Sequence, residues 1–85
     1  MSLAQIRYFV TVAEEKHVGR AARRLCVAQP AVSRQIRNLE GELGRPLFAR
    51  TARGMTLSPA GEVFLPRAQA ILADLAAATH AVRRI

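Results

Sequence analysis

The sequence has a single cysteine and no long apolar run, and each of these features excludes a class of protein. Cys26 is the only cysteine among the 85 residues, so no disulfide can form within the chain. Because it falls in a predicted helix hairpin, we expect it to be a small buried hydrophobe. No stretch is long enough to span a bilayer, and there is no signal-peptide pattern. The sequence therefore predicts a cytoplasmic protein that is not a membrane protein.

Arrangements typical of catalytic and metal sites are also absent. His17 and His80 lie in separate predicted elements, and the carboxylates form no pairs. One cysteine and two histidines provide no metal-binding spacing. We therefore expect that the chain is not an enzyme and holds no metal.

Acidic residues are scarce in one region only. The chain has 13 Lys and Arg against 6 Asp and Glu, a net charge of +7. Nine basic and two acidic residues lie between Lys16 and Arg53, so the whole excess of seven falls there and the other charges balance. A polyanionic partner would contact this middle region. The alternative at this point is a solvated basic surface without a partner.

Apolar residues recur at helical spacing in three successive segments. They predict helices over residues 3–14, 18–25 and 29–43, the last two joined by a tight connection. Pro30 suits the first turn of the third helix, and Gly44 is expected to cap its end. Two short helices joined by a short turn, the second polar on its outer face, indicate a helix-turn-helix.

Two short strands and a long helix follow. Residues 47–50 and 55–57 can pair as a hairpin around a loop at residues 51–54. Ser58 is expected to cap a helix that begins at Pro59 and continues to the end of the chain. The predicted fold class is mainly α: a winged helix-turn-helix of three helices and a two-stranded wing, followed by a long linker helix.

The long helix carries apolar residues in alternating steps of four and three, which form a heptad seam rather than the broader stripe of a core helix. The residues of this seam are Phe64, Ala68, Ile71, Leu75, Ala78, Val82 and Ile85. A stripe this long exceeds what a small core could bury, and an exposed one would be a liability. We expect it to pack against a copy of itself.

The third helix has a second row of side chains beside its apolar stripe. The residues of this row are Gln29, Pro30, Ser33, Arg34 and Arg37. Gln can pair with adenine and Arg with guanine, and a recognition helix reads bases with its N-terminal residues. The alternative is an ordinary surface helix with solvated polar groups. Glu40 falls on the same arc, where Arg37 could neutralise it.

The predicted hairpin would hold Arg53 at an exposed tip. An arginine in such a position can enter a narrow minor groove or contact phosphate. A plain hairpin is the alternative. Beside the basic middle of the chain, we interpret the hairpin as a DNA-binding wing.

The order of these segments is similar to that of a known family. RAARRL, VAQPAVSRQIRNLEGELG, PLFART-RG and LSPAG follow one another before the long helix. This order resembles the N-terminal DNA-binding domain of bacterial LysR-type transcriptional regulators, over essentially the whole chain. The resemblance implies sequence-specific binding of double-stranded operator DNA. It divides the chain into a winged helix-turn-helix domain, residues 1–58, and a linker helix for dimerisation, residues 59–85.

The resemblance also implies roles for individual residues. The base contacts would be Gln29, Pro30, Ser33 and Arg34 in the major groove and Arg53 in the minor groove. The candidates for phosphate contacts are His17, Arg20, Arg37 and Arg50. A homodimer with antiparallel linker helices would bind an inverted-repeat operator, and a tetramer of the full-length protein and a contact with RNA polymerase stay open. No cofactor is expected in this fragment; a small-molecule effector would bind a C-terminal domain absent from it.

The chain departs from the family pattern where the second helix begins. A stretch of the Gly-Ser-Phe-Thr type is usual there, and this chain has Lys16, His17, Val18 and Gly19. His17 is a weaker cap than a hydroxyl, and Gly19 lacks a hydroxyl that would contact phosphate. Lys16, His17 or Arg20 could replace that contact. Ala28, often Ser in the family, leaves the third helix with a weaker cap as well.

Two other classes of protein explain less of the sequence. A coiled-coil interaction module would account for the last third of the chain but not for its basic middle. A membrane-surface binder would need Lys and Arg beside one apolar helix, whereas here the charge is spread over several elements.

Overall fold

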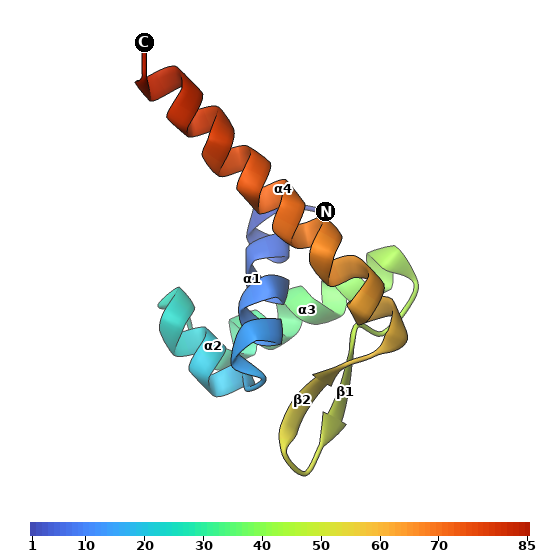
Figure 1. Ribbon diagram of the computed structural model, residues 1–85. Helices are drawn as coiled ribbons and strands as arrows, with labels where there is room; N and C mark the ends of the chain where they lie inside the picture. The colour runs from blue at the N-terminus through green and yellow to red at the C-terminus, as the bar shows by residue number, and fades with distance from the viewer.

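The computed structural model describes residues 1–85 and contains four helices and one hairpin (Figure 1). In chain order the elements are α1 (Leu3–Glu15), α2 (Val18–Leu25), α3 (Gln29–Leu43), β1 (Phe48–Thr51), β2 (Gly54–Leu57) and α4 (Pro59–Arg83). α1 contacts all three other helices. The predicted fold class is confirmed, and every predicted element is present. No helix has the length and hydrophobicity needed to cross a membrane.

The core forms where α1 meets the other elements. Phe9, near the middle of α1, has no exposed surface. The centroid of its ring lies 5.4 Å from that of Phe48 on β1 and 5.0 Å from that of Phe64 on α4. Burying a phenylalanine side chain contributes about 1.5–3 kcal/mol to folding. One residue of α1 therefore joins the wing and the long helix to the helix-turn-helix.

The helix ends follow the predicted capping pattern, with one addition. Ser58 accepts a hydrogen bond from the first turn of α4 at 3.0 Å. Gly44 ends α3 in the left-handed conformation, and Ala28 supplies no side-chain cap, both as expected. A capping box also opens α1, in which Ser2 and Gln5 each accept the other's backbone N–H. The apolar pattern alone did not reveal this cap.

The hairpin is short and held against the helices. β1 and β2 pair antiparallel, with Thr51 opposite Gly54 beside the turn. Met55 N–H donates to the Lys16 carbonyl at 3.1 Å. Gly54 has a φ of 118°, and a Cβ there would lie 2.5 Å from the same carbonyl oxygen. The wing is therefore fixed to the turn between α1 and α2, and only glycine fits at this junction.

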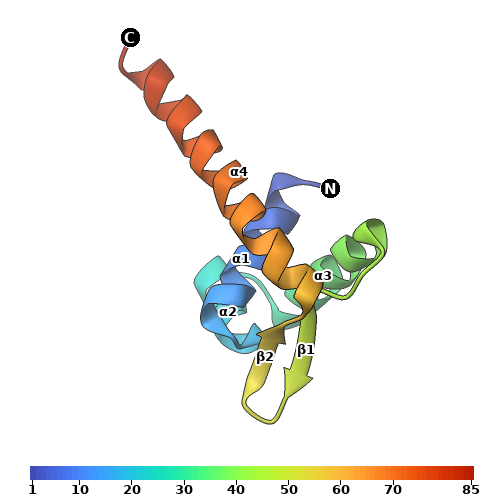
Figure 2. The ribbon, with the colours of Figure 1, turned by 45° about the vertical axis from the view of Figure 1, so that its right-hand side comes forward.

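The two halves of α4 have different surroundings. Ala68 is fully buried, and Phe64 packs against the core of the same chain. Contrary to the predicted seam, Ala68 has no surface left for a second copy, and Phe64 is partly covered by its own chain. Figures 1 and 2 show why: α4 crosses α1 with its first half and then extends past the rest of the molecule. Val82, in the extended half, is 73% exposed.

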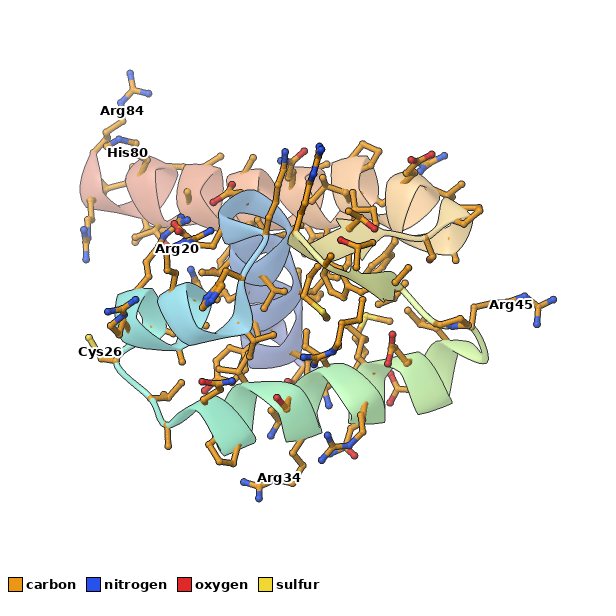
Figure 3. All side chains as sticks on the ribbon, turned by 90° about the horizontal axis from the view of Figure 1, so that it is seen from below. Arg20, Cys26, Arg34, Arg45, His80 and Arg84 are labelled. Carbon is orange, nitrogen blue, oxygen red and sulfur yellow. The ribbon has the colours of Figure 1, made fainter.

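Cys26 is exposed, which corrects the prediction that it is buried. It ends α2 in a left-handed conformation with φ of 58°. Figure 3 shows its side chain at the edge of the molecule. The following residue, Val27, packs against the core instead. The backbone turn after α2, which apolar spacing does not reveal, decides which of the two side chains faces inward.

Candidate nucleic-acid interface

Two adjacent faces of α3 have opposite surroundings. Val32, Ile36 and Leu39 are buried against the rest of the domain. On the neighbouring face the exposed residues are Gln29, Pro30, Arg34 and Arg37, with Ser33 half-buried beside them. Figure 3 shows Arg34 extending away from the body of the molecule. The split follows from apolar spacing, because burying one face of a helix leaves the adjacent polar face in solvent.

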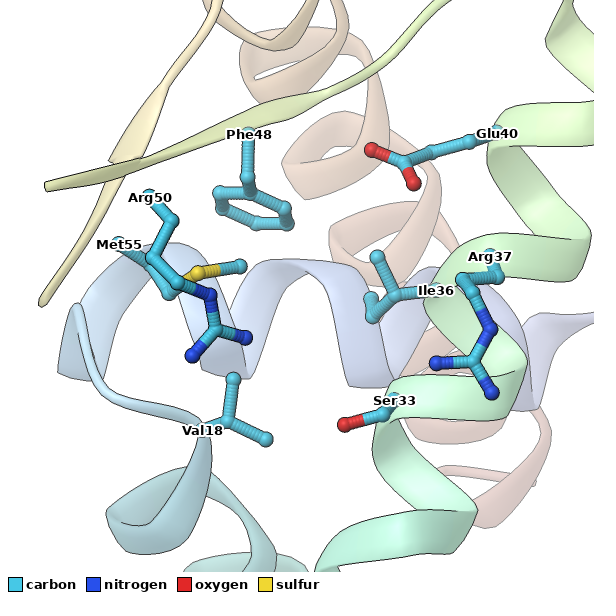
Figure 4. A pocket seen from close by; sticks show the side chains of 8 residues that line it. All are labelled: Val18, Ser33, Ile36, Arg37, Glu40, Phe48, Arg50 and Met55. Atoms are coloured by element: carbon cyan, nitrogen blue, oxygen red, sulfur yellow. The ribbon is translucent and has the colours of Figure 1, made fainter.

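A hollow lies between α3, the wing and the start of α2 (Figure 4). Arg37 of α3 and Arg50 of β1 reach into it from opposite sides, and the Ser33 hydroxyl points into it from α3. The other lining residues are Val18, Ile36, Glu40, Phe48 and Met55. Neither arginine forms an ion pair. Both guanidinium groups are therefore available to a polyanion.

Glu40 has a structural role that the sequence pattern did not reveal. Its Oε2 accepts a hydrogen bond from Leu47 N–H at 2.7 Å, which ties the end of α3 to the start of the wing. It forms no ion pair with Arg37, contrary to the expected neutralisation. The reason is the turn after Gly44, which brings the chain back so that the Leu47 backbone meets the carboxylate.

Arg53 lies at the tip of the wing. Thr51 Oγ1 accepts a hydrogen bond from Arg53 N–H at 3.2 Å and donates one to the Gly54 carbonyl at 3.1 Å, so the turn is tied internally. Arg53 is exposed and forms no ion pair. The wing tip, His17 and Gln29 line a second hollow. The wing and the start of α3 thus border the same space.

Two of the three arginines of α2, Arg20 and Arg24, are engaged within the chain. Arg24 lies 2.7 Å from Glu14 and 3.3 Å from Glu15, both at the end of α1. Hydrogen bonds to Glu14 and then to Glu15 raise the pKa of Arg24 above its ordinary value. Arg20 donates to the Glu15 carbonyl at 2.9 Å and lies 3.6 Å from its carboxylate. Arg20, one of the predicted phosphate contacts, is therefore held against α1.

His17 caps α2 in place of the usual hydroxyl. Its Nδ1 accepts a hydrogen bond from Arg20 N–H at 3.0 Å. A Cβ at Gly19 would lie 2.9 Å from Cε1 of the same ring and 3.4 Å from Oε1 of Gln29. The two departures from the family pattern, at residues 17 and 19, thus form one arrangement. The histidine ring occupies space that a side chain at residue 19 would need.

Comparison with known proteins agrees with this geometry. The sequence model described as "Bacterial regulatory helix-turn-helix protein, lysR family" matches residues 3–62. The chain belongs to the LysR family. Members of this family are transcriptional regulators, so the LysR-family chain is not an enzyme, as its sequence predicts.

Relatives of this LysR-family chain are longer than it is. It is 56% identical over 72 residues to the HTH-type transcriptional regulator TfdS of Cupriavidus pinatubonensis, covering 85% of the chain and 24% of TfdS. Over 85 residues it is 49% identical to the regulator BudR of Klebsiella aerogenes, covering 100% of the chain and 59% of BudR. The chain therefore spans about a quarter of TfdS and somewhat over half of BudR.

Solved structures share the fold. A crystal structure of the BenM DNA-binding domain with catB site 1 DNA has a TM-score of 0.95 at 42% identity, covering 99% of this chain and 94% of that chain. Full-length CbnR complexed with its target DNA has a TM-score of 0.87 at 42% identity, covering 99% of this chain and 29% of that chain. The LysR-family chain is thus a winged helix-turn-helix DNA-binding domain.

Proposed function

We propose that this chain binds a double-stranded operator sequence-specifically, with α3 in the major groove and the wing at the minor groove. The supporting observation is that four arginines on α3 and the wing form no ion pair. Arg34, Arg37, Arg50 and Arg53 are exposed on α3 and the wing and form no ion pair. Arginines in this state can displace counterions from phosphates, and those at a helix N-terminus can read base edges.

The residues proposed to contact DNA fall into two groups, those that contact bases and those that contact phosphates. We assign base contacts to Gln29, Pro30, Ser33 and Arg34, and the minor groove to Arg53. We assign phosphate contacts to His17, Arg37 and Arg50. Arg20 contributes less, because its guanidinium already donates to the Glu15 carbonyl. Guanidinium and carboxamide groups pair bidentately with guanine and adenine, which supports the division between reading and positioning residues.

Duplex binding in rising salt tests this proposal. A duplex selected from a randomised pool by this chain should bind more tightly than base-substituted duplexes at every salt concentration. The logarithm of the affinity should fall linearly with the logarithm of salt, by about 0.9 per phosphate neutralised by an arginine or lysine. Binding that depends on neither salt nor base sequence would contradict the proposal.

We further infer a homodimer that forms through the second half of α4. Ile71 is 39% exposed and Val82 73% exposed, and Leu75 and Ala78 lie between them on the same seam. Two such helices packed antiparallel would place two copies of α3 in successive major grooves of an inverted repeat. Half-sites would then be spaced by multiples of about 34 Å, one helical turn.

Leu75→Asp tests the dimer, because it would bury an unpaired carboxylate in the seam. Ala73→Asp is the matched control, since this exposed residue lies on the opposite face of α4. We expect the first variant to sediment as a monomer and lose affinity for a two-half-site duplex, and the second to remain a dimer. A wild-type chain that is monomeric at high concentration would contradict the model.

The remaining assignments concern the parent regulator. We propose a winged helix-turn-helix domain over residues 1–58 and a linker over residues 59–85, followed by a domain that binds a small-molecule effector. The greater length of TfdS supports the additional domain. Such a regulator would act in the cytoplasm, where tetramer formation and contact with RNA polymerase can be tested on the full-length protein by sedimentation and by cross-linking. A full-length protein that binds no small molecule would contradict the effector assignment.

A further inference from the structure

We propose that the His17 imidazole contacts DNA in place of the hydroxyl that Gly19 lacks, and that Gly19 is required to leave room for it. The inference rests on the proposed DNA binding by α3 and the wing. It treats residues 17 and 19 as one unit, because a Cβ at residue 19 would lie 2.9 Å from His17 Cε1.

The capping hydrogen bond determines which nitrogen of His17 can donate. Nδ1 accepts Arg20 N–H at 3.0 Å, so it carries no proton. In a neutral imidazole the proton must then lie on Nε2, which becomes a donor. No other group of the chain hydrogen-bonds to the His17 ring. The side chain is exposed, so Nε2–H is available to a phosphate oxygen.

Position distinguishes His17 from the other residues that could replace the missing hydroxyl. His17 and Gly19 line the hollow that also contains Gln29 and the wing tip with Arg53. Lys16 and Arg20 do not line it. Arg20 is turned toward α1, where it donates to the Glu15 carbonyl. Of the three candidates, His17 is therefore the one placed beside the base-reading and minor-groove residues.

Gly19 also adjoins a base-reading residue. The same Cβ would lie 3.4 Å from Oε1 of Gln29 and 3.2 Å from Nδ1 of His17. The ring cannot move away freely, because its Nδ1 is held by the cap. A methyl group at residue 19 would therefore either break the hydrogen bond between His17 Nδ1 and Arg20 N–H or push the His17 and Gln29 side chains out of the hollow.

Four variants test the coupling by affinity for a duplex selected from a randomised pool. His17→Ser keeps a strong cap but removes the imidazole donor, so affinity should fall about three- to tenfold while thermal stability is maintained. Gly19→Ala should cause a similar loss. In the double variant the losses should not multiply, because both changes remove the same contact. His17→Asn should retain more affinity than His17→Ser, since Asn caps a helix and still donates an N–H.

Gly41→Ala is the matched control for Gly19→Ala. A Cβ at Gly41, inside α3, meets nothing within 4 Å. Both substitutions raise helix propensity, but only the one at residue 19 crowds the histidine. Gly41→Ala should therefore leave DNA affinity unchanged. His17→Ser should also leave the salt dependence unchanged, because a neutral imidazole displaces no counterion.

The outcomes separate this inference from the proposed function. Failure of the wild-type chain to bind the selected duplex would contradict the proposed function itself. Wild-type binding that His17→Ser leaves intact would overturn the inference alone, as would losses from His17→Ser and Gly19→Ala that multiply. If His17 is only a cap, His17→Ser leaves both thermal stability and affinity unchanged, because Ser also caps the helix, and this outcome overturns the inference as well.

Discussion

Arg20 and Arg24 of α2 resemble the arginines of α3 and the wing in the sequence but differ from them in the structure. Arg24 bridges Glu14 and Glu15, whereas Arg34 and Arg53 have no anionic partner. In the sequence all of them belong to one basic region. Net charge therefore identifies the basic region of the sequence but does not show which of its arginines lack a carboxylate partner. That depends on which carboxylates the fold brings close.

The difference in pairing arises at the end of α1, which supplies the carboxylates that pair with Arg24. Glu14 and Glu15 lie outside the basic region of the sequence, yet the turn at Lys16 folds α2 back so that both reach Arg24. Of the two acids within the basic region, Glu40 accepts from the Leu47 backbone and Glu42 pairs with the N-terminal ammonium of Met1. No carboxylate pairs with the arginines of α3 and the wing.

The largest expected difference between the two groups lies at Arg34. Arg34→Ala should cost about 1–3 kcal/mol of binding to the selected duplex and relax preference at one base position. Arg24→Ala is the control and should leave base preference unchanged, because its charge is already paired. Competition with base-substituted duplexes measures both. Equal losses of specificity in the two variants would remove the distinction between the groups.

A smaller effect is expected at the wing. Arg53→Ala should weaken binding most when the DNA opposite the hairpin is rich in A·T, because a narrow minor groove concentrates negative potential. Affinities for duplexes that differ only in their flanks, A·T-rich or G·C-rich, measure this. An equal loss of affinity for the A·T-rich and G·C-rich duplexes would show that Arg53 contacts phosphate or lies away from the interface.

Arg37→Ala should have a weaker and more uniform effect. As a phosphate contact it should weaken cognate and random duplexes alike and reduce the salt slope by about 1. Titrations at several salt concentrations measure the slope for wild type and variant. A change in base preference instead would move Arg37 into the base-reading group.

The smallest expected effect comes from removing the carboxylates that pair with Arg24, which would leave this arginine without an anionic partner, like Arg34 and Arg53. Glu14→Gln with Glu15→Gln removes the partners of Arg24, so affinity for random duplexes at low salt should rise slightly. Thermal stability should change little, because exposed ion pairs contribute little to folding. Binding to random DNA and a melting curve measure the two quantities. Unchanged or lower affinity would show that the position of α2, and not pairing, keeps its arginines from DNA.

The order and type of the elements could be predicted because they depend on local properties. Apolar spacing identified α1, α2 and α3, and Ser58 and Gly44 marked helix ends. The polar row of α3 followed from the same periodicity, since a helix with one buried face must expose another. Which of its residues touch bases stays a prediction.

Contacts between elements could not be predicted, because they depend on how the chain turns. A left-handed residue after α2 exposes Cys26, and the turn after Gly44 brings Leu47 to Glu40. The crossing of α1 and α4 buries Ala68, although heptad spacing assigns it to a seam with another copy. Periodicity shows that a face is apolar but not what covers it.

The sequence by itself determined a basic winged helix-turn-helix with a long final helix, because helix periodicity, capping residues and charge are properties of neighbouring residues. Only the tertiary structure decided which arginines form ion pairs, which part of the apolar stripe of α4 stays exposed, and that the His17 ring lies against Gly19. These three depend on distances between side chains from different turns or elements. Such distances are set by packing around Phe9 and by the turns that join the helices.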